Sequence, residues 1–157
     1  MADDAASPEP RLTFPRSHRL KRKRLIQSLF DRSRDDVHSV ATGCVRLLVR
    51  TATPEDVGHN VPLQIGFSPG RRVPSGVPRT RVRRLLREVY RVHQHLLVDL
   101  FVRRPDVLLV MVLFRSTPDQ ASRISRDLPR AMKQLAARIP SLPHPDAPHG
   151  PSASASG

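Results

Sequence analysis

The sequence predicts an α+β fold, a two-layer α/β sandwich whose elements follow the order α-β-β-α-β-α. Three observations predict this fold class. Short stretches alternate apolar and polar residues, as strands do, and longer stretches have the 3.6-residue apolar spacing of amphipathic helices. Residues 106–114 (DVLLVMVLF) form a nearly continuous apolar run, which is typical of a central strand buried on both faces. The length of 157 residues is that of a single domain.

The first half of the chain is expected to hold one helix and two strands. A helix is predicted from Ser17 or His18 onward, because apolar residues follow at near-helical spacing: Leu20, Leu25, Ile26, Leu29 and Phe30. Residues 40–51 are predicted as a strand, and residues 53–60 (TPEDVGHN) have the composition of a turn. Residues 63–67 are predicted as a second strand that pairs with the first.

The second half is expected to hold two helices on either side of the central strand. A loop with Pro-Gly and Pro-Ser-Gly at its ends precedes a long helix over residues 77–98, where Pro78 is tolerated in the first turn. The apolar stripe of this helix consists of Val82, Leu85, Leu86, Val89, Val92 and Leu96. A last helix is predicted over residues 118–138, and we expect Pro129 to bend it.

The two ends of the chain have the composition of disordered segments. The first residues are small, acidic and Pro-containing, and the tail is rich in Pro, Ser and Ala, with Leu142 as its only large apolar residue. Such segments cannot bury enough apolar surface to offset their ordering entropy. We therefore expect a disordered leader over residues 1–14, a folded domain over residues 15–139 and a disordered tail over residues 140–157.

The composition also bears on the cellular compartment. No apolar run approaches the ~20 residues that a transmembrane helix needs, and the N-terminus lacks the apolar stretch of a secretory signal. Cys44 is the only cysteine, which excludes an intrachain disulfide and a multi-cysteine zinc site. These features predict a cytoplasmic protein without a membrane partner.

The positive charge is large and concentrated in two windows. The chain has 27 Lys and Arg residues against 14 Asp and Glu, a formal net charge of +13. Residues 11–24 carry seven basic side chains and no acid, and residues 71–91 carry eight arginines and one acid, while the remainder is close to neutral. Charge concentrated in this way predicts a surface that binds a polyanion.

Arginines in the second window fall on one side of the predicted helix. Arg79, Arg83, Arg87 and Arg91 are spaced i, i+4 and form a ridge, and Arg81 and Arg84 flank it. Like charges at this spacing weaken an isolated helix by about 0.2–0.5 kcal/mol per pair. The alternative is an ordinary solvated basic face, but this density of arginine favours neutralisation by phosphates.

Residues 70–88 (GRRVPSGVPRTRVRRLLRE) resemble the signature of the bacterial ribonuclease P protein component. In that family a basic pair and a short loop precede Arg-Asn-Arg-x-[Lys/Arg]-Arg-x-[Leu/Ile]-Arg on a helix. Thr80 stands where the family usually has Asn, and Pro74 and Pro78 are also unusual there. Residues 19–30 (RLKRKRLIQSLF) are similar to the family's basic opening helix, and residues 64–68 (QIGFS) to the strand before its basic pair.

The resemblance implies a fold of the ribosomal protein S5 domain 2-like type with a left-handed βαβ crossover, whereas general rules favour a right-handed one. It also implies the RNA-binding protein subunit of ribonuclease P, an endoribonuclease that removes the 5′ leader from precursor tRNA. In this family the partners are a catalytic RNA subunit and precursor tRNA. The RNA subunit holds the catalytic Mg²⁺, and the protein, which has no catalytic residue, binds the leader and stabilises the active RNA.

The resemblance assigns two RNA-contacting surfaces. The 71–91 region is expected to contact the RNA subunit through phosphates. The residues expected to bind RNA are Arg71, Arg72, Arg79, Thr80, Arg81, Arg83, Arg84 and Arg87, with Arg19, Lys21 and Arg22 from the first window. A cleft between the first helix and the open sheet face is expected to hold the single-stranded leader through Ile26, Phe30 and Phe67, by stacking and charge. From the sequence alone, Phe30 and Phe67 are equally compatible with ordinary core positions.

The sequence contains no credible catalytic or metal-binding set. His93 and His95 are about 200° apart on a helix and cannot bind one metal ion, and Cys44 is expected to be a small buried residue. We therefore expect no cofactor bound by the protein itself. The alternative function is that of a ribosomal or ribosome-assembly protein. The basic-pair loop followed by the arginine helix argues against it, because ribosomal proteins of this fold are not expected to show that motif. A protein that reads DNA would need Asn or Gln among the arginines.

Overall fold

Four strands form one mixed sheet in the order β2-β3-β5-β4 in the computed structural model, which describes residues 13–142. The strands are β2 (His38–Thr42), β3 (Val45–Ala52), β4 (Leu63–Ser68) and β5 (Val107–Phe114). Strand β3 pairs antiparallel with β2 and with β5, whereas β4 and β5 are parallel. The apolar run predicted as a central strand is β5, which is buried along nearly its whole length.

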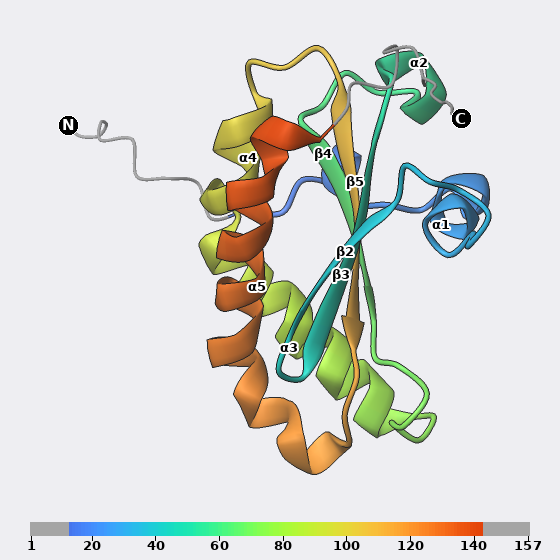
Figure 1. The fold of residues 1–157 in the computed structure, drawn as a ribbon. Coiled ribbons are helices and arrows are strands. Elements are labelled where there is room, and N and C mark those ends of the chain that lie inside the picture. Colours follow the sequence, from blue (N-terminus) through green and yellow to red (C-terminus); the bar gives the residue numbers. More distant parts are fainter. Residues whose placement is uncertain (1–12, 143–157) are drawn as a thin grey trace, which may run out of the picture.

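Helices cover both faces of this sheet unequally (Figure 1). One face is covered by α3 (Val77–His93), α4 (His95–Phe101) and α5 (Ile124–Arg138). The short helices α1 (Lys23–Leu29) and α2 (Pro54–Val57) lie on the other face. Three 3-10 turns complete the described chain: η1 (Arg16–His18), η2 (Pro118–Arg123) and η3 (Ile139–Ser141). The mixed α+β class predicted from the sequence is confirmed.

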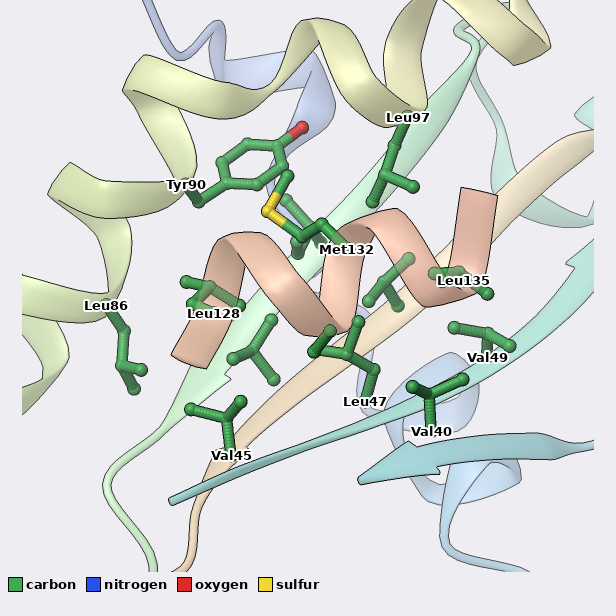
Figure 2. Close-up of a cluster of buried hydrophobic side chains, with 14 of the residues drawn as sticks. Val40, Val45, Leu47, Val49, Leu86, Tyr90, Leu97, Leu128, Met132 and Leu135 are labelled. Carbon is green, nitrogen blue, oxygen red and sulfur yellow. The ribbon is translucent and has the colours of Figure 1, made fainter. Parts of the chain in front are cut away.

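The main core lies between the sheet and α3–α5. Strand residues of one parity point into it, and Figure 2 shows them around Leu128, Met132 and Leu135 of α5, with Leu86 and Tyr90 of α3 close by. A smaller apolar cluster on the opposite face joins α1 and α2 to the sheet; its buried members are Leu20, Leu25, Leu29, Ala52, Val57, Val107, Leu109 and Met111. The two clusters leave part of that second face uncovered by helices.

The prediction of a single strand over residues 40–51 is wrong. This stretch holds parts of β2 and β3, which form a hairpin with a two-residue turn at Gly43 and Cys44. Gly43 has φ +58, a left-handed conformation that suits the tight turn. The buried carboxylate of Asp127, in the first turn of α5, accepts a hydrogen bond from the backbone N–H of Cys44 at 3.0 Å. The hairpin is therefore tied to α5.

The prediction that the strand at residues 63–67 pairs with the preceding strand is also wrong. Strand β5 lies between β3 and β4 and pairs with both. Because β4 and β5 are parallel neighbours, the chain must cross from one end of the sheet to the other between them. Helices α3 and α4 make this crossover.

The helix boundaries differ from those predicted. The long helix over residues 77–98 is two helices, α3 and α4, which meet at Gln94. The Gln94 side chain donates to the carbonyl oxygens of Thr13 at 2.8 Å and Arg91 at 3.0 Å. The first helix, α1, begins only at Lys23, and Ser17 lies in η1. The predicted last helix is η2 followed by α5, which continues through Pro129.

An N-terminal segment, residues 13–20, crosses the edge of the sheet. Arg19 forms a parallel bridge with Ile65 of β4, and the N–H of Leu20 donates to the Ile65 carbonyl at 3.0 Å. The side chain of Gln64 donates to the Ser17 carbonyl at 2.9 Å. Phe14 in this segment packs on the main core. The segment therefore covers an edge strand that would otherwise be open.

The C-terminal end of the described chain also packs on the core. Ile139 and Leu142 are buried in the main cluster, so ordered packing continues beyond residue 139. Most of the predicted leader, residues 1–12, and of the predicted tail, residues 143–157, lies outside the described residues. Within residues 13–142, no helix is long and apolar enough to cross a membrane.

Candidate nucleic-acid interface

The loop between β4 and α3 carries the basic pair Arg71 and Arg72, and both side chains are exposed. Two features hold this loop in place. Gly70 has φ +81, and a Cβ atom there would overlap the backbone carbonyl of Phe114 on β5. Val73, three residues later, is buried in the main core. The basic pair is therefore presented by a loop that is anchored on either side.

Arg79 is turned back toward this loop. Its Nη1 atom donates to the carbonyl oxygens of Gly70 at 2.5 Å and Val73 at 3.2 Å. Helical spacing predicts that Arg79 lies on the exposed ridge of the helix, next to Arg83. The structure instead uses the Arg79 guanidinium to join the first turn of α3 to the loop before it.

The exposed ridge of α3 consists of Arg81, Arg84 and Arg87, with Thr80 beside them. It lies opposite the buried residues Val82, Leu86 and Val89. Arg83 is half-buried at its flank. Arg91, the last member of the predicted ridge, forms an ion pair with Glu88, whose pKa is lowered by that hydrogen bond. The basic face predicted from i, i+4 spacing therefore exists, but the residues that form it differ.

The basic window near the N-terminus lies mostly before α1 and not on it. Arg19 is half-buried, with its guanidinium carbon 5.3 Å from the centre of the Phe14 ring. Lys21 is exposed. Arg22 and Arg24 are exposed and donate to the carbonyl oxygen of Asp56 at 3.4 and 3.0 Å. Part of this window therefore fastens the start of α1 to α2.

A groove lies on the sheet face opposite α3–α5. It consists of two adjacent hollows of about 490 and 440 Å³ that share Phe30 and Leu113. The first hollow is lined by Leu29, Phe30, Asp31, Arg32, Arg34, Val37, Ser39, Arg46, Leu48 and Leu113. The second is lined by Phe30, Ser68, Gly70, Arg71, Arg72, Leu113, Phe114 and Arg115. Each hollow thus combines apolar side chains with three arginines.

The structure separates the three residues expected in the leader cleft. Phe30, at the C-terminal end of α1, is 48% exposed and lines both hollows. Ile26 packs partly buried against the smaller apolar cluster and lines neither hollow. Phe67 faces the opposite side of the sheet, where its ring centre lies 5.8 Å from those of Phe14 and Tyr90. The expectation that Phe67 forms the floor of this cleft is wrong.

Four arginines in the groove lining were not predicted from the sequence: Arg32, Arg34, Arg46 and Arg115. Arg46 was within reach of prediction, because Val45, Leu47 and Val49 are its apolar neighbours of the other parity in β3. Arg34 forms a two-pronged ion pair with Asp36, at 2.9 Å for each bond, which lowers the pKa of Asp36. The remaining three arginines line the groove without this constraint.

Two buried side chains of the described residues, Cys44 and Tyr90, have raised pKa values. Burial, together with the neighbouring carboxylate of Asp127, raises the pKa of the Cys44 thiol to about 12, so this thiol is unreactive. Burial likewise raises the pKa of Tyr90, inside the main core. Within residues 13–142, no three His, Cys, Asp or Glu side chains gather in a way that could hold a metal ion.

Comparison with known proteins gives two findings. A family model described as Ribonuclease P matches residues 14–137. Among solved structures, the fold is similar to that of the RNase P protein of Staphylococcus aureus, with a TM-score of 0.50 and 21% sequence identity over 75% of this chain and 94% of that one. At this identity the likeness concerns the fold. None of the curated proteins matches the chain.

Proposed function

The chain belongs to the ribonuclease P family, and we propose that this protein subunit in tRNA 5′ processing binds RNA through two opposite surfaces. One is the arginine ridge of α3 with the adjoining loop. The other is the groove on the far side of the sheet. The ridge binds the RNA subunit, and the groove binds the 5′ leader of precursor tRNA.

The ridge suits a structured RNA backbone. Arg81, Arg84 and Arg87 project into solvent from one side of a 17-residue helix, whose opposite side is fixed by the main core. Rigidly placed guanidinium groups bind phosphates with well-defined geometry, and the like-charge repulsion within the ridge is relieved when phosphates are bound. Arg71 and Arg72 lie on the loop that leads into this helix and also line the groove. They adjoin both surfaces.

The groove suits a single strand of RNA. The observation that carries this assignment is Phe30, an aromatic side chain left 48% exposed between two hollows that are both lined by arginines. An exposed ring can stack on an unpaired base, and the flanking guanidinium groups can bind the phosphates on either side. Leu48 and Leu113 supply an apolar surface beneath the ring. Ile26 is a neighbour of this site and supports the position of α1.

The chemistry is proposed to belong to the RNA subunit. Mg²⁺ ions held by that RNA supply the charge stabilisation that phosphodiester hydrolysis requires. The protein then contributes binding: it neutralises phosphates of the RNA subunit and positions the leader of the substrate.

Two finer features of the fold are part of the proposal. The parallel pair β4–β5, joined through α3 and α4, supports a βαβ crossover, which we propose to be left-handed. We also propose that the sandwich belongs to the ribosomal protein S5 domain 2-like type. An experimental structure that shows a right-handed crossover would overturn both.

Reconstitution tests the proposed function. RNA-free protein, the cognate RNA subunit and precursor tRNA are combined over a range of Mg²⁺ concentrations, and 5′ cleavage is measured. We expect no cleavage by the protein alone, and cleavage at lower Mg²⁺ by the protein with its RNA than by the RNA alone. Cleavage by RNA-free protein, or an unchanged Mg²⁺ requirement, would contradict the proposal.

A further inference from the structure

Helix α5 carries a second stripe of basic residues, which the charge windows of the sequence conceal. Arg123, at the start of the helix, Arg126, Arg130 and Lys133 are spaced i, i+3, i+7 and i+10, and all four side chains are exposed. This spacing places them on one side of the helix. The core residues Ile124, Leu128, Ala131, Met132 and Leu135 form the other side. The four residues are called the α5 stripe below.

Only one residue of the stripe, Arg126, has an acidic partner on α5. The only carboxylate among residues 122–138 is that of Asp127, which is buried and accepts hydrogen bonds from the Cys44 N–H and from Arg126 Nε, each at 3.0 Å. Within the described chain, Arg123, Arg130 and Lys133 form no ion pair. The nearest acid before the helix, Asp119, accepts hydrogen bonds from Thr117 and Gln120, which lower its pKa, and the charge of Arg123 lowers this pKa further. The stripe therefore carries more positive than negative charge, and Arg130 and Lys133 form no ion pair within residues 13–142.

The position of the stripe is unfavourable for the isolated helix. Arg123 and Arg126 lie at the N-terminal end of α5, where the helix dipole favours negative side chains. Successive members of the stripe are three or four residues apart, so like charges are neighbours on the helix surface. Both effects oppose folding of α5 and both are relieved by a bound anion. The arrangement therefore points to a ligand and not to helix stability.

We propose that the α5 stripe binds the phosphodiester backbone of the RNA subunit. This inference rests on the proposed function, because α5 packs beside α3 on the same face of the sheet. Figure 2 shows Leu128 of α5 near Leu86 of α3, and the exposed sides of both helices are basic. Ten residues of helix span about 15 Å, a length over which a strand presents several phosphates. The leader groove lies on the opposite sheet face, so the stripe does not contact the leader.

A triple variant tests the stripe: Arg123→Gln, Arg130→Gln and Lys133→Gln. Glutamine retains a good helix propensity, and Arg126 is kept because it is paired with Asp127. Affinity for the cognate RNA subunit is measured at several salt concentrations. The slope of log K against log[salt] is negative, and each lost phosphate contact reduces its magnitude by about 0.7–0.9. We therefore expect the magnitude of the slope to fall by about 2–3 and the affinity to fall on the order of 50-fold near 0.15 M salt. The ratio of precursor to mature tRNA affinity should stay unchanged.

Two control variants make the outcomes distinct. Arg103→Gln removes one exposed charge from the turn after α4, away from the stripe, and should keep the wild-type slope. The double variant Arg84→Gln and Arg87→Gln removes two charges from the α3 ridge and should lower the slope. Thermal unfolding confirms that each variant is folded.

A wild-type slope in the triple variant, together with a lowered slope in the α3 double variant, would overturn the stripe and leave the proposed function intact. The stripe would also be overturned if Arg103→Gln reduced the magnitude of the slope by as much per removed charge as the triple variant does, because net charge alone would then explain the effect. Wild-type protein that does not bind the RNA subunit would contradict the proposed function itself. A lowered slope in the triple variant alone would support the stripe and remove the ridge from the interface.

Discussion

Arg79 and Gly70 are joined by a hydrogen bond of 2.5 Å from a guanidinium nitrogen to a backbone carbonyl oxygen. The same nitrogen reaches the carbonyl of Val73 at 3.2 Å. Between these carbonyls lie Arg71 and Arg72, which line the groove. Arg79 thus holds the backbone that presents the basic pair, although its place in the sequence is within the arginine ridge.

Replacement of Arg79 by Ala is expected to destabilise the fold. Hydrogen bonds from a charged donor contribute about 1.5–3 kcal/mol, so Arg79→Ala should lower the free energy of unfolding by roughly that amount. The matched variant Arg84→Ala removes an exposed guanidinium from the same helix. It should leave unfolding nearly unchanged and lower the salt slope of RNA binding by somewhat less than one unit. Urea unfolding and salt titrations on both variants measure the difference. Equal stability of the two variants would show that the Arg79 contacts contribute nothing.

Phe30 and Phe67 are expected to respond in opposite ways to truncation. Phe30→Ala removes a half-exposed ring from the groove and should weaken precursor tRNA binding by about 1–3 kcal/mol, with mature tRNA binding unchanged. Phe67→Ala removes a ring that packs on the main core and should cost about 3 kcal/mol of stability. Thermal unfolding and the precursor-to-mature affinity ratio are measured on both. A large loss of stability in Phe30→Ala with an unaltered ratio would contradict the groove assignment.

Gly70 and Gly76 flank the same loop, and replacing each by alanine distinguishes backbone strain from steric overlap of the added Cβ atom. Both have positive φ, +81 and +92, so an alanine at either position is strained by about 1–3 kcal/mol. Only at position 70 would the added Cβ also overlap a backbone atom, the Phe114 carbonyl; at position 76 nothing lies within 4 Å. Gly70→Ala should therefore lower the melting temperature more than Gly76→Ala. The reverse order would refute the close approach of the loop to β5.

Asp127 is expected to make stability depend on acid pH. Burial raises its pKa, but hydrogen bonds from the Cys44 N–H and from Arg126 outweigh this and hold the pKa below its usual value. Its contribution is therefore fully present above a pH of about 4 and is lost as the pH falls through the lower, folded-state pKa. Asp127→Asn should be less stable than wild type at pH 7, and the two should converge in strong acid. Parallel curves of unfolding free energy against pH would contradict this.

The sequence predicts which segments are helices and strands better than it predicts which strands pair. The apolar run at residues 106–114 predicts the buried strand β5. The Pro-Ser-Gly end of the loop, followed by Pro78 in a first turn, predicts that α3 begins at Val77. The hairpin turn has only a weak signal in the sequence, because Gly43 is the one typical turn residue between Val40 and Arg50. The position of β5 between β3 and β4 depends on contacts between distant segments, whereas neighbouring strands usually pair. Local periodicity contains no information about such contacts.

The candidate site was predicted in part, for similar reasons. The sequence leaves both Phe30 and Phe67 open between cleft and core. Strand parity would have assigned Phe67 to the core, since it shares a face of β4 with the core residues Leu63 and Ile65. The inward turn of Arg79 could not have been predicted from helical spacing. A long, flexible side chain near a helix start can reach either solvent or the preceding loop, and only the path of that loop decides.

The insertion of β5 between β3 and β4 has a consequence for synthesis on the ribosome. The last strand to emerge is the central one, so a nascent chain that ends before residue 107 has two separate parts of a sheet and no partner between them. In such a chain Leu47 and Leu63, which are fully buried between the sheet and the helices α3–α5 in the finished fold, are open to water. Pairings of such large sequence separation form slowly. The chain therefore passes through an interval in which the apolar faces of β3 and β4 are unprotected, and this interval ends only after β5 and then α5 leave the ribosome.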